Sequence, residues 1–247
     1  MDVRLVAVQL DALDPAVPAA FWAGLLGRTT VVEPAGTLLP GDGTQVGLRF
    51  VPGGEAKVAQ NPVHLHLTST SIADQEATVA RALGLGGHAV DVGQRPEEGH
   101  VVLGDPEDNE LCVIEPGNAF LDGCGFLGEV TCRGTRDVGV FWSEALGWPL
   151  VWDRDGETAI QSPDGGTKVS WGGEPVDPDA PPARQRLELA AATDDLGPTV
   201  DRLVALGATR VDDPAGPDPS VAVTLADPDG HPFHLRRDRP GAGDGGS

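Results

Sequence analysis

The chain has 247 residues, 40% of them hydrophobic, and its formal net charge at pH 7 is −21. Such a surface repels nucleic acids and anionic membranes, so we expect neither as a partner. The three cysteines form no CxxC pair. Their odd number and spacing argue against a disulfide framework. No apolar run approaches the roughly 20 residues of a membrane span. No signal-peptide pattern opens the chain, and together these features predict a cytoplasmic protein.

Short strands and helices follow one another in a fixed order along the chain. "RLVAVQL" predicts a strand, the segment before Gly27 a helix, and "TTVV", "TLLP" and "VGLRFV" three more strands. The order starts again at "VHLHLT", with a helix before Gly84 and strands at "HAVDV", "HVVLG" and "ELCVIE". Apolar residues in the helical segments recur at helical spacing. A glycine after each helix suits the left-handed residue that closes it.

The second half of the chain repeats the first. "FWAGLLGRTTVV" is echoed by "FWSEALGWPLVW", and "LGDPEDNELCVIEP" by "LADPDGHPFHLRRD". Each Asp-Pro pair places proline at the second position of a tight turn, where its fixed φ fits. We therefore predict an α+β protein of four βαβββ modules. Residues 1–117 and 126–238 form the two halves, the linker lies around 117–125, and 239–247 is a flexible tail.

The motifs resemble a known family. "FVPGGEAKVAQNPVHLHL" and "VVLGDPEDNELCVIEP" are similar to the glyoxalase-like subgroup of the vicinal oxygen chelate (VOC) superfamily. This is the glyoxalase/bleomycin resistance/dihydroxybiphenyl dioxygenase fold. The resemblance implies that modules pair edge to edge and that their sheets curl into cups that hold a ligand. We expect one cup from each half, although fold does not settle chemistry.

Metal enzymes of this family place His, Gln or Glu on inward-facing strand positions. We align three of these positions in each half and leave the fourth unassigned. In the first half they fall near Ala7 and on His64 and Cys112, and in the second near Glu129 and Arg186 and on His234. Alanine has no donor atom, and a permanently charged arginine repels a cation. We therefore expect no bound cofactor, with a divalent metal as the less favoured alternative.

The first-half cup is the expected ligand site. His64 and His66 lie two apart on a strand and so point to the same face, where we also expect Gln9 and Cys112. Two neighbouring histidines resist being protonated together, so they should titrate as a coupled pair. They would offer polar contacts to a ligand and a general acid or base. The alternative is a pair of buried, hydrogen-bonded histidines without function.

The second-half cup admits two interpretations. An inward Arg186 opposite His234 would favour an anionic ligand. Alternatively, a salt bridge from Arg186 to Glu129 closes a degenerate pocket. Both interpretations treat Glu129 and His234 as residues of the same cup.

The sequence leaves open whether the protein is an enzyme. We expect a small-organic-molecule binding protein or a metal-independent enzyme, monomeric or homodimeric, with its ligand in the first-half cup. One alternative is a metal-dependent lyase, isomerase or dioxygenase of the glyoxalase type. Another is an antibiotic-sequestering resistance protein, for which the acidic surface would suit a cationic drug.

Overall fold

The computed structural model describes residues 2–53, 57–95, 97–175, 177, 181, 183–212 and 222–237. The order strand, helix, three strands occurs four times. The first module holds β1 (Val3–Ala12), α1 (Ala16–Leu26), β2 (Val31–Glu33), β3 (Gly36–Leu39) and β4 (Gly47–Pro52). The second holds β5 (Val63–Leu67), α2 (Ile72–Gly84), β6 (His88–Ala89), β7 (Val101–Gly104) and β8 (Glu110–Val113).

The other two modules follow a linker that contains the short 3-10 helix η1 (Ala119–Leu121). The third holds β9 (Leu127–Arg133), α3 (Arg136–Leu146), β10 (Leu150–Arg154), β11 (Glu157–Gln161) and β12 (Lys168–Gly172). The fourth holds β13 (Gln185–Ala191), α4 (Gly197–Ala205), β14 (Thr209–Arg210), β15 (Ala222–Ala226) and β16 (Pro232–Arg237). The predicted α+β class and the four βαβββ modules are confirmed.

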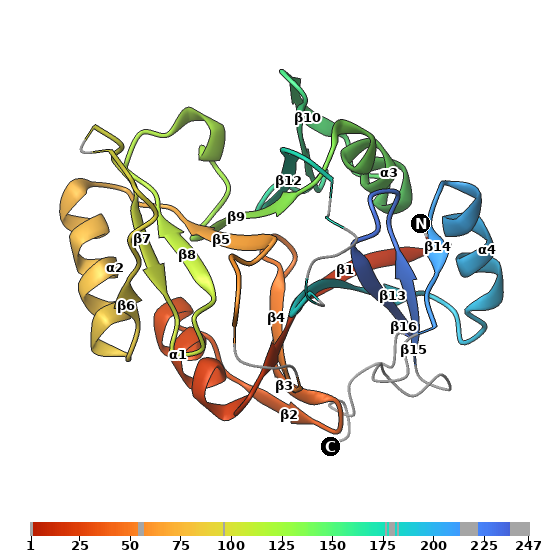
Figure 1. The fold of residues 1–247 in the computed structure, drawn as a ribbon, viewed down its shortest axis with the longest axis horizontal. Helices are drawn as coiled ribbons and strands as arrows, with labels where there is room; N and C mark the ends of the chain where they lie inside the picture. Colours follow the sequence, from red (N-terminus) through yellow and green to blue (C-terminus); the bar gives the residue numbers. More distant parts are fainter. Residues whose placement is uncertain are drawn as a thin grey trace, which may run out of the picture.

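The strands form two mixed sheets of eight strands each (Figure 1). Sheet A has the order β14-β15-β16-β13-β1-β4-β3-β2, and sheet B the order β10-β11-β12-β9-β5-β8-β7-β6. Sheet A thus joins the first module to the fourth, and sheet B joins the second to the third. The expectation of one cup per half was wrong, because β1 pairs antiparallel with β13 and β5 with β9. Pairing within the first half would join β1 to β5, but the edges of these strands are already occupied by β13 and β9.

The two modules of each half are joined on their helical side instead. Asp105, in the Asp-Pro turn between β7 and β8, is fully buried. The indole Nε1 of Trp22 in α1 donates to its Oδ2 at 2.9 Å, and the backbone N–H of Asn109 donates to its Oδ1. Trp142 in α3 makes the matching contact with Asp227 at 3.4 Å. The repeated turn motif therefore ties neighbouring modules together.

One main hydrophobic core lies on the helical side of both sheets. Alternation within a strand decides which side chains enter it. In β5, Val63, Leu65 and Leu67 belong to this core, so His64 and His66 point to the opposite face. We call that opposite side of each sheet its cup face. The cup faces carry the polar side chains considered below.

The helix ends follow the sequence prediction in part. Gly27 and Gly147 close α1 and α3 in the left-handed conformation, with φ of 66° and 63°. Gly84 does not close α2, because it is still helical and Leu85 is the capping residue. The predicted tail, 239–247, lies outside the described residues. None of the described helices is both long and apolar enough to cross a membrane.

Candidate functional site in the cup of sheet B

Three side chains from three neighbouring strands meet on the cup face of sheet B. In the strand register, His66 of β5 lies directly opposite Cys112 of β8 on one side. On the other side it lies opposite Glu129 of β9. Side chains at paired positions project to the same face at close range. Cys112, His66 and Glu129 therefore form a row across the sheet, which we call the sheet B row.

Hydrogen bonds fix the imidazole and the carboxylate of this row. The Nδ1 of His66 donates to Glu129 Oε2 at 2.6 Å, and the hydroxyl of Ser170 in β12 donates to Glu129 Oε1 at 2.5 Å. Cys112 lies at the position paired with His66 on β8. Because Nδ1 is engaged on Glu129, Nε2 is the remaining ring nitrogen. Both oxygens of the Glu129 carboxylate are thus satisfied, and the imidazole is held in one orientation.

The environment keeps the His66 ring charged. Burial alone lowers the pKa of His66, but the hydrogen bonds and negative charges of Cys112 and Glu129 outweigh it and raise the pKa to about 10. The side chain of His66 is 19% exposed and that of Glu129 only 8%. The row is therefore a largely buried ion pair beside a thiol, and the charge on His66 is stable at neutral pH.

His64 lies on the same face, but its pKa is shifted in the opposite direction. Burial lowers its pKa, although the nearby Glu110 carboxylate acts in the other direction. Its Nε2–H donates to the carbonyl oxygen of Asn61 at 2.9 Å. Lys57 forms an ion pair with Glu110. The positive charge of His66 also lowers the pKa of His64, so the pKa values of the two histidines shift in opposite directions.

The linker between the halves covers one end of this cup. Leu121 and Cys124 form a small apolar cluster with Val102, Cys112 and Ile114, and Phe120 packs against it. The ammonium group of Lys168 in β12 donates to the backbone oxygen of Phe120 and lies 4.5 Å from its ring centroid. Sequence reasoning missed the linker, Ser170 and Lys168. The alternation of β12 could have placed both polar residues on the cup face.

Gln9 does not lie in this cup. It projects from β1 on the cup face of sheet A, where its side-chain oxygen accepts a hydrogen bond from His234 Nδ1 at 3.1 Å. The expectation that Gln9 joins His64 and Cys112 was therefore wrong. Likewise, Glu129 belongs with His66 rather than with His234, because β9 pairs with β5.

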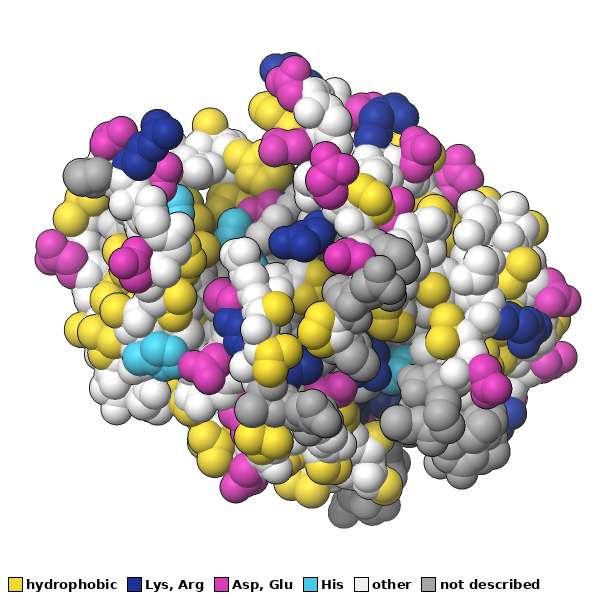
Figure 2. Space-filling model, viewed as in Figure 1, with side chains coloured by type: hydrophobic (Ala, Val, Ile, Leu, Met, Phe, Trp, Pro, Cys, Tyr) yellow, Lys and Arg dark blue, Asp and Glu magenta, His cyan; other side chains and the backbone are white. Residues whose placement is uncertain are grey.

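Ion pairs fill the rest of the cup face of sheet A. Arg49 of β4 is 2% exposed. Its Nη1 lies 2.6 Å from Glu33 Oε2. Its Nε lies 2.8 Å from Glu188 Oε2, as an ion pair without the geometry of a hydrogen bond. Arg236 contacts Glu188 at 3.2 Å. Figure 2 shows Lys and Arg side chains, with acidic ones among them, in the lower central part of the face.

Arg186 is also paired, but not with Glu129. Its guanidinium forms an ion pair with Asp11 of β1, so the predicted Arg186–Glu129 salt bridge was wrong. Arg186 and His234 do share sheet A. Burial and the charges of Arg186 and Arg236 lower the pKa of His234 to about 3. His234 is therefore neutral, and its Nε2 has no hydrogen-bond partner among the described residues.

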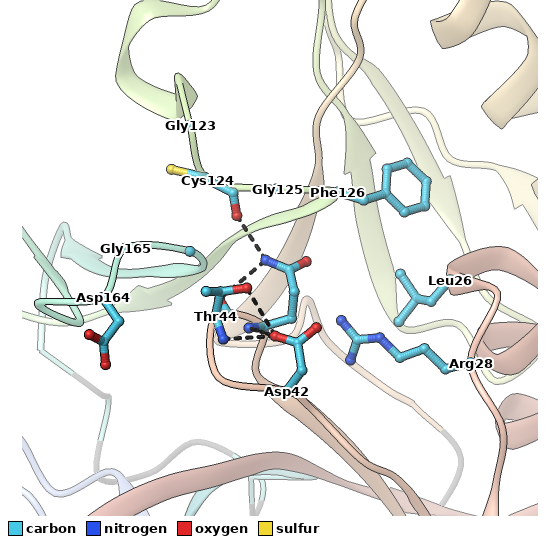
Figure 3. Close-up of a pocket in the computed structure, with 12 residues that line it drawn as sticks. Leu26, Arg28, Asp42, Thr44, Gly123, Cys124, Gly125, Phe126, Asp164 and Gly165 are labelled. Atoms are coloured by element: carbon cyan, nitrogen blue, oxygen red, sulfur yellow. Dashed lines mark hydrogen bonds between the residues drawn. The ribbon is translucent and has the colours of Figure 1, made fainter.

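A separate pocket of about 450 Å³ lies where the linker meets two loops (Figure 3). The loop before β4 contributes Asp42 and Thr44, and the turn before β12 contributes Asp164. The Asp42 carboxylate accepts hydrogen bonds from the backbone N–H and hydroxyl of Thr44. Gln45 donates to the carbonyl oxygen of Cys124 at 2.8 Å. These contacts hold the linker in place.

Comparison with known proteins identifies the family. The model of the Glyoxalase-like domain matches residues 7–114 and again residues 129–236. The chain belongs to this family. None of the curated proteins matches the chain.

Solved structures with the glyoxalase-like architecture span nearly the whole chain. Glyoxalase I from Zea mays is 16% identical, with a TM-score of 0.60, over 95% of this chain and 92% of that one. A putative dioxygenase from Bacillus subtilis subsp. subtilis str. 168 is also 16% identical. Its TM-score is 0.58, over 96% of this chain and 86% of its own. Likeness at this level of identity concerns the fold alone.

The glyoxalase-like resemblance implies a metal on the cup faces, and the side chains present do not fit one. On sheet A, Ala7 offers no donor and the guanidinium of Arg49 already lies on Glu188. On sheet B, both Glu129 oxygens accept hydrogen bonds, and the His66 imidazolium supplies the positive charge. Among the described residues, no three His, Cys, Asp or Glu side chains are grouped to hold a metal ion.

Proposed function

We propose that this glyoxalase-like protein binds a small organic molecule in the cup of sheet B and does so without a metal. The observation that carries the proposal is the His66 imidazolium fixed by Glu129 in the middle of the cup face. A buried charge with a set orientation is costly to maintain. It is also well suited to donate a hydrogen bond to a ligand oxygen. The ligand oxygen would accept a hydrogen bond from the second ring nitrogen, which Glu129 does not engage.

The cup of sheet A is less suited to an anionic ligand. Arg49 and Arg236 contact Glu188, and Arg186 contacts Asp11. A ligand carboxylate would have to displace these partners and leave a buried acidic group unpaired, which costs several kcal/mol. This network supports a structural role for sheet A.

The same site accommodates simple binding or catalysis. Ser170, Cys112 and His66 provide a hydroxyl, a thiol and a charged acid within one cup, which is enough for proton transfer without a metal. A metal-dependent reaction is disfavoured because the donor atoms are engaged. Sequestration of a cationic drug is disfavoured because such a ligand would meet His66 and Lys168. Three free cysteines support a reducing, cytoplasmic setting.

A thermal-shift screen of small carbonyl compounds and carboxylates tests the proposal. A ligand at about 100 times its Kd should stabilise the protein by about 2.7 kcal/mol. His66→Gln should abolish the shift. His88→Gln, a matched change at a histidine that is 47% exposed on β6, should preserve it.

Two outcomes would overturn the proposal. In one, the stabilisation is lost in Arg186→Ala and retained in His66→Gln, which would place the ligand on sheet A. In the other, metal analysis of the purified protein finds one equivalent of a divalent ion with His64, His66 or Glu129 as a ligand.

A further inference from the structure

The sheet B row has an arrangement that binding alone does not require. Its thiol, imidazole and carboxylate stand on adjacent strands, in the order Cys112, His66, Glu129. The carboxylate contacts one ring nitrogen at 2.6 Å, and the thiol lies at the paired position on the neighbouring strand. A thiol beside an imidazole that a third group orients is the geometry of an activated nucleophile. Such a constellation is recognised by geometry and roles rather than by its order in the chain.

We propose that Cys112 is a nucleophile that adds to small, uncharged conjugated carbonyl compounds, with His66 as the proton carrier and Glu129 as the positioning residue. This proposal rests on the proposed function, because it takes the same cup as the place where the molecule binds. It adds a covalent step and a substrate class to that site.

The addition balances with water as the only further reactant. Cys112 reacts as the thiolate beside the His66 imidazolium, and its sulfur attacks the β-carbon of the conjugated carbonyl. One carbon–sulfur bond forms, and the carbon–carbon π bond breaks to give an enolate. The His66 imidazolium then gives a proton to the α-carbon and takes up another from water. Throughout the step Glu129 stays ionised and holds the imidazole in place, as the third member of such a triad does.

The walls of the cup determine the substrate class. Cys112 is 7% exposed and belongs to the apolar cluster with Val102, Ile114 and Leu121. Apolar walls disfavour a charged electrophile, because a charge loses its hydration there. Sulfur is a soft, polarisable nucleophile, and conjugated carbonyl compounds are soft electrophiles. The His66 charge next to the thiol stabilises the negative charge that develops on the enolate oxygen.

The first test uses the unmodified protein and N-ethylmaleimide, a small uncharged conjugated carbonyl compound. The alkylation rate of each cysteine is followed by peptide mass spectrometry at pH 7 and compared with that of N-acetylcysteine. A free thiol is only a few per cent ionised at this pH, so activation allows Cys112 to react about tenfold faster or more. A Cys112 rate below that of N-acetylcysteine, as burial of an inert thiol would give, overturns the proposal.

Variants separate the proposed roles. His66→Gln should slow alkylation of Cys112 by about 100-fold, and Glu129→Gln should slow it by a smaller factor. His88→Gln should leave the rate unchanged. Equal Cys112 rates in wild type and His66→Gln overturn the proposal. Cys112→Ser distinguishes it from the proposed function. If Cys112→Ser still binds screened ligands reversibly while wild-type Cys112 is unreactive, the covalent step fails and the binding function stands.

Discussion

The charge of His66 depends on one partner from each half of the chain. Burial by itself would hold the pKa of this ring low, and the contacts with Cys112 and Glu129 raise it to about 10. Because the folded-state pKa exceeds the ordinary value, this group stabilises the fold fully below about pH 6.5. The stabilisation is lost as the pH rises through about 10.

Glu129→Gln should therefore change the titration of His66. The variant removes the Glu129 charge and leaves the burial, so the pKa of His66 should fall below its wild-type value of about 10. Nuclear magnetic resonance of the histidine rings between pH 5 and 10 measures this directly. In the wild type the His66 ring should still be protonated at pH 8. Identical His66 titration curves in the two proteins would show that Glu129 does not set the charge.

His234 should make the stability depend on pH in the opposite sense. Its folded-state pKa is lowered to about 3, so below pH 6.5 the unfolded chain binds a proton that the folded chain resists. The neutral His234 ring contributes its full stabilisation above pH 6.5, and this contribution is progressively lost as the pH falls towards about 3. Between pH 7 and 5 the wild type should lose about 2 kcal/mol through this residue.

Urea unfolding of His234→Gln at both pH values checks this expectation. The variant lacks the titrating group, so its free energy of unfolding should fall less between pH 7 and 5 than that of the wild type. His88→Gln provides the control, since His88 is exposed. The same pH dependence in wild type and His234→Gln would contradict the assigned environment of His234.

The sequence predicts which face a residue occupies better than it predicts its neighbours. Alternation in "VHLHLT" places His64 and His66 together on one face, as the structure does. No local pattern indicates that Glu129 lies opposite His66, because that contact depends on which strand lies beside β5. Gln9 was assigned to the wrong cup for the same reason. The sheet B row therefore needed the three-dimensional structure.

Among the connecting elements, the turn between β11 and β12 lies very close to the loop of Thr44. Gly166 has a φ of +89°, and a Cβ added there would lie 1.7 Å from the carbonyl oxygen of Thr44. Gly165 has a similar φ of +81° but no atom within 4 Å of an added Cβ. Both glycines have the left-handed backbone conformation, but only at Gly166 would an added Cβ clash with a neighbouring loop.

Alanine at each position should separate these two effects. Gly165→Ala should destabilise the protein by about 1–2 kcal/mol, the cost of a left-handed residue. Gly166→Ala should cost about 1–3 kcal/mol more, because the turn and the loop of Thr44 must move apart. Chemical denaturation of both variants gives the comparison. Equal losses would mean that the close approach of the Thr44 loop does not constrain position 166.

At the scale of the whole molecule, neither half should fold alone. Residues 1–117 contain β1 and β5, and each of these strands forms its central pair with a strand of the other half. A lone half would leave both strand edges and part of the main core exposed to water. We expect separately produced fragments 1–117 and 126–247 to show no cooperative unfolding as monomers.

Mixing the two fragments in equal amounts should restore a cooperative transition, since all of the central pairs then form. Circular dichroism during thermal unfolding, together with light scattering to confirm the fragment mass, measures both conditions. A monomeric 1–117 fragment with its own sharp transition would show that each half is an independent folding unit.

The module count was predictable and the module pairing was not. Four helix ends and two Asp-Pro turns are local signals, so they determine the repeat from sequence alone. Pairing depends instead on contacts far apart in the chain, such as Val3 with Ala191. The expected pairing within a half satisfies the same local patterns as the pairing observed. Only the long-range strand edges distinguish the two arrangements.

The crossed pairing gives the chain an approximate twofold symmetry, in which the first module corresponds to the third and the second to the fourth. Ala7, Glu188 and His234 occupy the same register in sheet A as Glu129, His66 and Cys112 in sheet B. In a dimer of identical halves, each substitution would alter both cups at once. A single chain removes that constraint, so one cup can keep a reactive row while its counterpart becomes a network of ion pairs.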